Sequence, residues 1–211
     1  MVSAEQVVYI VEDDEAVRDS LSMLLEAEGY DVEAFADAQQ FLDRYDENMA
    51  GCILLDIRMP GMTGMELHRK LIDMQCPLPV IFVTGHGDVP LAVEAMKQGA
   101  VDFVQKPYQE KQLLDKIRTA MAQDAEQRDL LQEKKEILKR LETLTPRERE
   151  IMEMMVEGNA NKVIAIELDI SQRTVEIHRS RVMQKMGTHS LAQLVRMVLA
   201  VGGARKAASG D

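Results

Sequence analysis

The chain has 211 residues, of which 46% are hydrophobic and 29% are charged, and its formal net charge is −11. This length suits two modest domains, and the composition is typical of a soluble globular protein. Every apolar run is shorter than the roughly 20 residues that cross a bilayer, which excludes a membrane-spanning class. The first six residues contain no basic segment or cleavage site, so we expect no secretory signal. Cys52 and Cys76 fit no metal spacing, and we expect free thiols in a cytoplasmic protein.

The negative charge belongs to the first part of the chain. Residues 1–121 hold 22 acids and 10 bases, a balance of −12. Residues 122–143 hold 6 acids and 5 bases, a balance of −1. Residues 144–211 hold 8 acids and 10 bases, a balance of +2. This asymmetry indicates two domains with different tasks, and only the second has the sign of charge that suits nucleic acid.

The first 122 residues alternate short apolar runs with helical patterns. We expect strands at 7–11, 31–35, 52–55, 79–83 and 101–104, and helices at 16–29, 38–45, 66–74, 90–98 and 110–122. Almost continuously apolar strands are typical of parallel sheets, because both faces of such sheets are covered. The pattern therefore predicts an α/β domain over 1–122, with a five-stranded parallel, doubly wound (βα)5 sheet.

Residues 123–143 predict a helical linker. They are rich in charge and lack Gly and Pro, and five of them are large and apolar: Leu130, Leu131, Ile137, Leu138 and Leu141. A solvated helix and a helix that pairs with another chain both fit this pattern, because the apolar spacing covers too few heptads to decide. We favour a continuous linker helix.

Residues 144–203 predict an all-α domain of four helices. Thr145, Pro146 and Glu148 form a capping box with Pro at the first helical position, which starts the first helix. The other helices are expected at 162–168, 171–186 and 190–201. The second and third are separated by a short turn, which is typical of a helix-turn-helix. We expect residues 204–211 to form a disordered tail.

Polar residues follow four of the five predicted strands. In a doubly wound sheet the carboxyl ends of the strands meet at one ligand-binding edge, which here carries Glu12, Asp13, Asp56, Thr84 and Lys106. Two carboxylates 4 Å apart repel by about 4 kcal/mol at an effective dielectric of 20. Mg²⁺ removes that cost and also binds phosphate oxygens. Lys106 and Thr84 can bind a phosphate, so we expect Asp56 to act as a nucleophile that forms an acyl phosphate.

Several stretches carry a resemblance to a known family. They are Val11–Arg18, Leu55–Gly64, Val83–Pro90 and Ala95–Pro107. Residues 7–121 resemble CheY-like receiver domains. The whole chain resembles the FixJ subgroup of the NarL/LuxR-type response regulators.

The resemblance implies that Asp56 accepts phosphate from a sensor histidine kinase. Glu12 and Asp13 would form the acidic pair, with Asp13, Asp56 and the backbone carbonyl of Arg58 contacting Mg²⁺. Glu12 stands where the family more often has Asp. Arg18, five residues beyond Asp13, sets this alignment and makes the neighbouring Asp14 an extra acid rather than a ligand.

The same resemblance implies a switch. Thr84 and Phe103 correspond to a pair in which the hydroxyl moves toward the phosphate and the ring turns inward. The Lys106–Pro107 bond is expected to be cis, which X-Pro energetics permit. Arg58 and His86 would flank the phosphate entry.

The tail resembles the LuxR-type DNA-binding domain, which implies binding to promoter DNA. Glu176, Ile177 and Ser180 would face base edges, where Glu can accept from a cytosine amine and Ile can touch a thymine methyl. The residues expected nearer phosphates are Lys162, Thr174, His178, Arg179 and Lys185. A charge of +2 indicates weak binding by one copy, so we expect a homodimer, formed on phosphorylation, on an inverted repeat. RNA polymerase is the further partner implied, and activation of transcription is the family default.

Three other functions remain as alternatives. An aspartyl phosphatase also places Asp after a parallel strand, but it usually has a second Asp two residues on, where this chain has Arg58. A flavodoxin-like nucleotide-binding module lacks support because no glycine-rich phosphate loop is present. A protein-interaction adaptor would not bind DNA through its tail. We expect no enzyme activity beyond slow hydrolysis of the acyl phosphate.

Overall fold

The computed structural model describes residues 6–85 and 89–208. The chain divides into two compact units, residues 1–128 and 129–211. Each unit has its own hydrophobic core. Within the described ranges, no helix has both the length and the hydropathy needed to cross a membrane.

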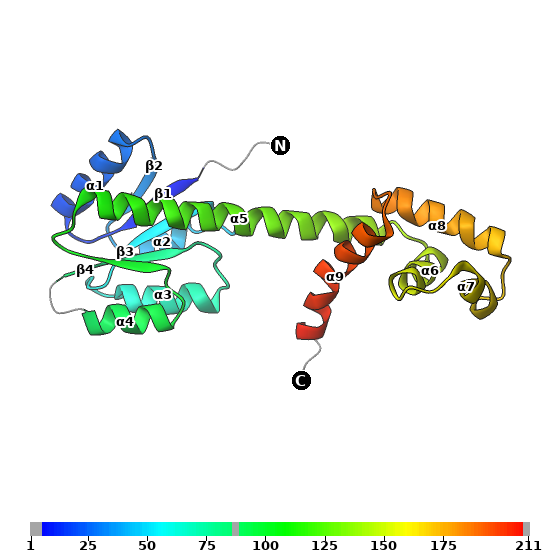
Figure 1. Cartoon of the computed structure of the whole chain (residues 1–211). Helices are drawn as coiled ribbons and strands as arrows, with labels where there is room; N and C mark the ends of the chain where they lie inside the picture. Colours follow the sequence, from blue (N-terminus) through cyan, green and yellow to red (C-terminus); the bar gives the residue numbers. More distant parts are fainter. Residues whose placement is uncertain (1–5, 86–88, 209–211) are drawn as a thin grey trace. The chain divides into compact units, whose positions relative to one another are not determined.

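A five-stranded parallel sheet forms the centre of the first unit (Figure 1). Its strands are β1 (Val7–Val11), β2 (Asp31–Phe35), β3 (Gly51–Asp56), β4 (Val80–Thr84) and β5 (Asp102–Gln105), in the order β2-β1-β3-β4-β5. All neighbouring pairs are parallel. The interior strands β3 and β4 are buried along their whole length, as their continuous apolar sequences predict. The predicted α/β fold is confirmed.

Helices cover both faces of this sheet. They are α1 (Glu15–Ala27), α2 (Ala38–Arg44), α3 (Gly64–Asp73), α4 (Val89–Lys97) and α5 (Glu110–Glu142). Buried side chains of α1 and α5 form one core with the sheet, and those of α2, α3 and α4 form the other. The predicted helices are all present, with their first residues displaced by at most a turn. Asp14, Asp37 and Thr63 cap the amino ends of α1, α2 and α3, and these caps fix the starting points that periodicity alone leaves imprecise.

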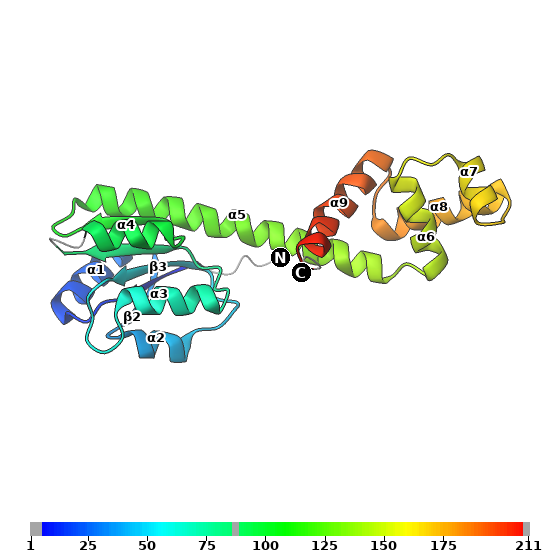
Figure 2. The same cartoon turned by 90° about the horizontal axis from the view of Figure 1, so that it is seen from below.

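The helix predicted over 110–122 and the linker predicted over 123–143 are one helix. α5 has 33 residues and is unbroken in both views (Figures 1 and 2). The two units divide between Arg128 and Asp129, six residues beyond the predicted end of the first domain. The reason is that Asp124 is buried and bonded to residues of the first unit. Pairing of the linker with another chain stays a prediction.

Four helices, together with the end of α5, form the second unit (Figure 2). They are α6 (Pro146–Val156), α7 (Asn161–Glu167), α8 (Gln172–Met186) and α9 (Leu191–Ala208). The capping box at Thr145 is present, with Pro146 at the start of α6. α9 extends to Ala208, beyond the end expected near residue 201, and a disordered tail over 204–211 stays a prediction. Residues 209–211 lie outside the described range.

Candidate functional site

Three predicted acidic residues meet at the carboxyl ends of β1 and β3. Asp56 is the last residue of β3 and is 7% exposed, while Glu12 follows β1 and is 3% exposed. Asp13 is exposed beside them. One carboxylate oxygen from each of the three lies within 4.8 Å of the other two. Because β1 and β3 pair in register, with Val11 opposite Leu55, the residues that follow them come together at one edge.

This cluster has the ligands of a hard divalent cation. All three residues offer carboxylate oxygens, which is the donor set that Mg²⁺ prefers. The repulsion among the carboxylates also favours a cation between them. The backbone N–H of Arg58 donates to Oδ2 of Asp56 at 2.6 Å, so this part of the backbone lies beside the cluster. Ligation by the Arg58 carbonyl stays a prediction.

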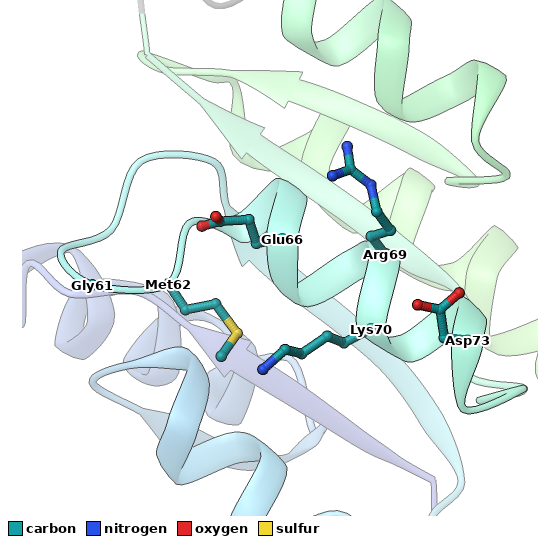
Figure 3. A pocket seen from close by; sticks show the side chains of 6 residues that line it. All are labelled: Gly61, Met62, Glu66, Arg69, Lys70 and Asp73. Atoms are coloured by element: carbon teal, nitrogen blue, oxygen red, sulfur yellow. The ribbon is translucent and has the colours of Figure 1, made fainter.

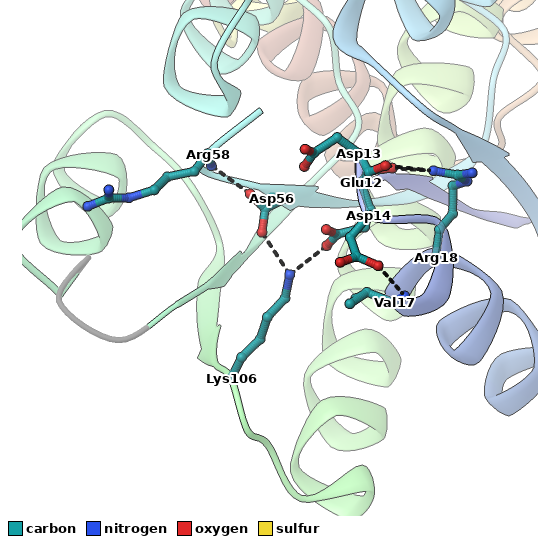
Figure 4. A network of polar contacts seen from close by, with 8 residues as sticks. All are labelled: Glu12, Asp13, Asp14, Val17, Arg18, Asp56, Arg58 and Lys106. Carbon is teal, nitrogen blue, oxygen red and sulfur yellow. Dashed lines mark hydrogen bonds and ion pairs between the residues drawn. The ribbon is translucent and has the colours of Figure 1, made fainter. Parts of the chain in front are cut away.

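Lys106 reaches into the cluster from the residue after β5 (Figure 4). Its Nζ lies 2.6 Å from Oε2 of Glu12 and 2.9 Å from Oδ1 of Asp56. Burial raises the pKa of Glu12 above its usual value, and the charge of Asp56 adds to the rise while the bond from Lys106 opposes it. Burial alone would lower the pKa of Lys106, but its bonds to Asp56 and Glu12 raise it, so the ammonium stays charged. The Lys106–Pro107 bond is cis, as expected.

Asp14 and Arg18 organise the loop that carries the acidic pair. The carboxylate of Asp14 accepts from the Val17 N–H at 3.1 Å and so caps α1. Arg18 Nη1 donates to the backbone carbonyls of Glu12 at 2.8 Å and Asp13 at 3.3 Å (Figure 4). From the sequence, Arg18 served only to set the alignment with the family. The signal for this further role was its position on the second turn of α1, from which a long side chain can reach back to the loop.

The expected switch residues lie on β4, which pairs with β3, and on β5, which pairs with β4. Thr84, the last residue of β4, is fully buried, and its hydroxyl donates to the Gly85 carbonyl at 3.3 Å. Phe103 in β5 is half-buried and packs against the same core as Phe82, the residue opposite it in the sheet. Their movement on phosphorylation stays a prediction. His86 lies outside the described residues.

One face of α8 presents the predicted base-contacting residues. Glu176, Ile177 and Ser180 are exposed, and with Arg173 they line a hollow of about 600 Å³. Their spacing of three, four and seven residues from Arg173 places all four on one side of the helix. The opposite side of the helix faces the core, as the apolar spacing predicts: its residues Val175, Val182 and Met186 are each 0% exposed. Arg173 was not among the residues predicted from the sequence to contact DNA.

The residues expected near phosphates fall into two groups. Lys162 is exposed at the start of α7, and Thr174, His178 and Arg179 are half-buried along α8. Lys185 differs, because its Nζ donates to Oε2 of Glu148 at 2.6 Å and to the Thr143 carbonyl at 2.9 Å. These bonds give Lys185 a structural role inside the unit that its charge alone did not reveal. Its contact with a phosphate stays a prediction.

A second hollow lies on α3 of the first unit. It measures about 420 Å³ and is lined by Gly61, Met62, Glu66, Arg69, Lys70 and Asp73 (Figure 3). Glu66 already caps α3 through its bonds to Thr63, and the lining mixes both signs of charge. No residue of the acidic cluster lines this hollow, so it is a separate feature.

A parallel (βα)5 unit with an acidic cluster and a lysine at its carboxyl edge, followed by a helix-turn-helix unit, is the architecture of a response regulator. Residues 8–118 match the response regulator receiver domain, and residues 142–198 match the luxR family of bacterial regulatory proteins. The chain belongs to this family of two-domain response regulators, in the FixJ subgroup. It is therefore a transcription regulator of a two-component system.

Named relatives span almost the whole chain. The transcriptional regulatory protein FixJ of Bradyrhizobium diazoefficiens is 46% identical over 92% of this chain and 95% of its own. The response regulator protein TmoT of Ectopseudomonas mendocina is 42% identical over 93% and 90%. Among solved structures, the response regulator StyR is 40% identical, with a TM-score of 0.85 over 92% of this chain and 98% of its own. Full-length FixJ from B. japonicum is 44% identical, with a TM-score of 0.59 over 95% and 98%.

Proposed function

We propose that Asp56 accepts a phosphoryl group from a sensor histidine kinase and that this modification controls DNA binding by the second unit. The observation that carries the proposal is the position of the Lys106 ammonium, 2.9 Å from Asp56 and 2.6 Å from Glu12. An ammonium group at this position can bind the oxygens of an incoming phosphoryl group. Asp56 is the only member of the cluster that both ends a buried strand and bonds to Lys106.

In the proposed transfer, an oxygen of Asp56 attacks the phosphorus of the kinase phosphohistidine. The new O–P bond forms as the N–P bond breaks, and the imidazole leaves with the bonding electron pair. Asp13, Asp56 and the Arg58 carbonyl would hold Mg²⁺, which supplies neutralising charge for the transferring group. Glu12 holds Lys106 in place through the 2.6 Å bond. Lys106 remains protonated throughout and pairs with a phosphoryl oxygen.

The response would then begin at Thr84. Its hydroxyl, buried and bonded to the Gly85 carbonyl, can turn toward the phosphoryl oxygens, which frees space for Phe103 to move inward. These movements would reshape the surface made by α4, β5 and α5. Leu91 and Val93 on α4 are 40% and 46% exposed, and such apolar residues suit the pairing of two receivers.

The paired protein would bind an inverted repeat in promoter DNA through α8. Glu176, Ile177 and Ser180 would read bases, and Lys162, Thr174, His178, Arg179 and Lys185 would contact phosphates. The basic balance of the tail and the exposed face of α8 support this assignment. We further propose activation of transcription through RNA polymerase, a cytoplasmic location, and no enzymatic turnover of other phosphate esters.

The proposal is tested with the full-length chain and a DNA duplex selected from a random pool by the phosphorylated protein. Acetyl phosphate and Mg²⁺ should tighten binding by a factor within the roughly 5–150-fold range of ordinary allosteric coupling. Asp56→Asn should abolish this change, and Asp73→Asn, at the exposed end of α3, should keep it. An Asp56→Asn protein that responds like the wild type would overturn the proposal.

A further inference from the structure

A buried charge cluster lies at the amino end of β3, at the other end of the strand from Asp56. Its centre is Asp124 in α5, which is 2% exposed. The Asp124 carboxylate accepts from the Gly51 N–H at 2.9 Å and from the Gln6 amide at 3.2 Å. Arg128 Nε lies 2.9 Å from both oxygens of Asp124, and Arg128 also donates to the Met49 carbonyl. Gln6, Gly51 and Arg128 therefore meet at one carboxylate, and Arg128 adds the Met49 carbonyl to the cluster.

This cluster fixes the helix to the strand. Gly51 has a φ of 125°, and a Cβ at this position would overlap the carbonyl oxygen of Val7, so only glycine fits at the start of β3. A buried ion pair costs desolvation that a pair of apolar side chains would avoid. The Asp124–Arg128 pair instead fixes the position of α5, because its directional hydrogen bonds join the helix to β3 in one register.

The cluster also joins the strand that carries the phosphoacceptor to the helix that continues into the second unit. β3 is buried along all six residues and is bonded on both sides, to β1 and β4. Its last residue is Asp56 and its first is Gly51, which Asp124 binds. Beyond Arg128, the side chains of residues 129–135 are exposed, and α5 then contributes Ile137 and Leu141 to the core of the second unit.

We propose that Asp124 and Arg128 are positioning residues for the response: they fix α5 to the start of β3, so that a change at Asp56 reaches the helix that enters the DNA-binding unit. The inference rests on the proposed function, because it requires a phosphorylation-dependent response to transmit. In the wild type, phosphorylation of Asp56 changes the affinity for DNA. When the Asp124–Arg128 pair is broken, Asp56 is still phosphorylated, but the affinity for DNA no longer changes.

The test uses four variants of the full-length protein. Asp124→Asn and Arg128→Met break the pair, and Arg128→Lys keeps the positive charge. Glu126→Gln, an exposed residue of the same helix, is the matched control for loss of a charge. For each variant, mass spectrometry measures phosphorylation of Asp56 by acetyl phosphate, and an unfolding curve establishes that the chain is folded. The response is the ratio of Kd values without and with acetyl phosphate, measured on the duplex selected by phosphorylated wild-type protein.

In Arg128→Met and Asp124→Asn we expect labelling like that of the wild type but a Kd ratio that falls to within about 2-fold of unity, from the roughly 5–150-fold range of the wild type. Glu126→Gln should keep the wild-type ratio, and Arg128→Lys should recover most of it. If Asp124→Asn does not fold, the Kd ratio of Arg128→Met decides whether the inference holds. A fully labelled Arg128→Met protein with the wild-type ratio would overturn this inference alone. A wild-type protein that has the same Kd with and without acetyl phosphate would overturn the proposed function, and this inference with it.

Discussion

The ammonium of Lys106 lies 2.9 Å from Oδ1 of Asp56, although fifty positions separate the two residues in the chain. The same ammonium lies 2.6 Å from Glu12, so one cation neutralises part of the charge of a three-carboxylate cluster. Both acidic partners of Lys106 are buried, which strengthens these bonds relative to the same bonds in water. Glu12 and Asp56 therefore hold the Lys106 ammonium beside the proposed nucleophile before any phosphate is bound.

Replacement of Lys106 should slow phosphorylation. Lys106→Met removes the cation that we expect to pair with the phosphoryl oxygens. The substitution also leaves the carboxylates of Asp56 and Glu12 without the positive charge between them. The rate of labelling by acetyl phosphate should fall by about 10²-fold, the scale for removal of one such donor. Lys70→Met, at an exposed position of α3, should label at the wild-type rate. A Lys106→Met protein that labels normally would remove Lys106 from the mechanism.

Removal of the Thr84 hydroxyl should disconnect phosphorylation from DNA binding. Thr84→Val keeps the shape of a fully buried side chain but has no donor for the phosphoryl oxygens. We expect Asp56 to be labelled while the gain in DNA affinity is lost, and Thr84→Ser should restore the gain. Labelling by acetyl phosphate and a gel-shift titration measure the two properties. A normal gain in Thr84→Val would show that the hydroxyl plays no part in the switch.

The sequence predicted the first unit well because its signals are local and strong. Apolar strands, each followed by polar residues, indicated a parallel sheet with one functional edge, and the structure brings Glu12, Asp13 and Asp56 together there. The partners of each charge depend on packing between distant segments. Asp124 looks like one more acid on a solvated helix, yet Gly51, 73 positions away, binds it in the core.

In the second unit, too, the sequence did not reveal a contact between distant residues. Periodicity identified the buried residues of α8, but the spacing of charges did not show that Lys185 bonds to Glu148, 37 positions away.

The bond between Glu148 and Lys185 makes the second unit sensitive to acid. The Lys185 ammonium and the Thr145 N–H lower the pKa of Glu148 from 4.5 to about 2. Because the folded value lies below the unfolded one, the ionised carboxylate stabilises the fold above pH 4.5, and this contribution is lost as the pH falls from 4.5 toward 2. Glu148→Gln should lower the free energy of unfolding at neutral pH by about 1–3 kcal/mol.

Hydrogen exchange of the α8 amides measures this effect within the second unit. The difference between wild type and Glu148→Gln should shrink as the pH falls below 4.5. Glu150→Gln breaks the Arg147–Glu150 pair, whose Glu side chain is 53% exposed, and should change stability by less than about 1 kcal/mol. A Glu148→Gln effect that stays constant with pH would contradict the role of the ionised carboxylate.

Two residues of the DNA-binding unit should separate affinity from base preference. Lys162→Met should weaken binding to all duplexes alike and reduce the salt slope of log K by about 1, because it removes one phosphate contact. Glu176→Gln, on the exposed face of α8, should change the preferred base at one position by about 1–3 kcal/mol and leave the salt slope unchanged. Titrations against a set of single-base variants at several salt concentrations measure both. The reverse pattern would mean that α8 does not lie in the major groove as proposed.

Mass spectrometry of the full-length protein after treatment with acetyl phosphate and Mg²⁺ tests the account most directly. We predict one added phosphoryl group that maps to Asp56, is removed by hydroxylamine as an acyl phosphate should be, and is absent when Mg²⁺ is chelated. Asp56→Asn should remain unmodified under the same conditions. An unmodified wild-type chain, or a phosphoryl group that maps to another residue, would contradict the account.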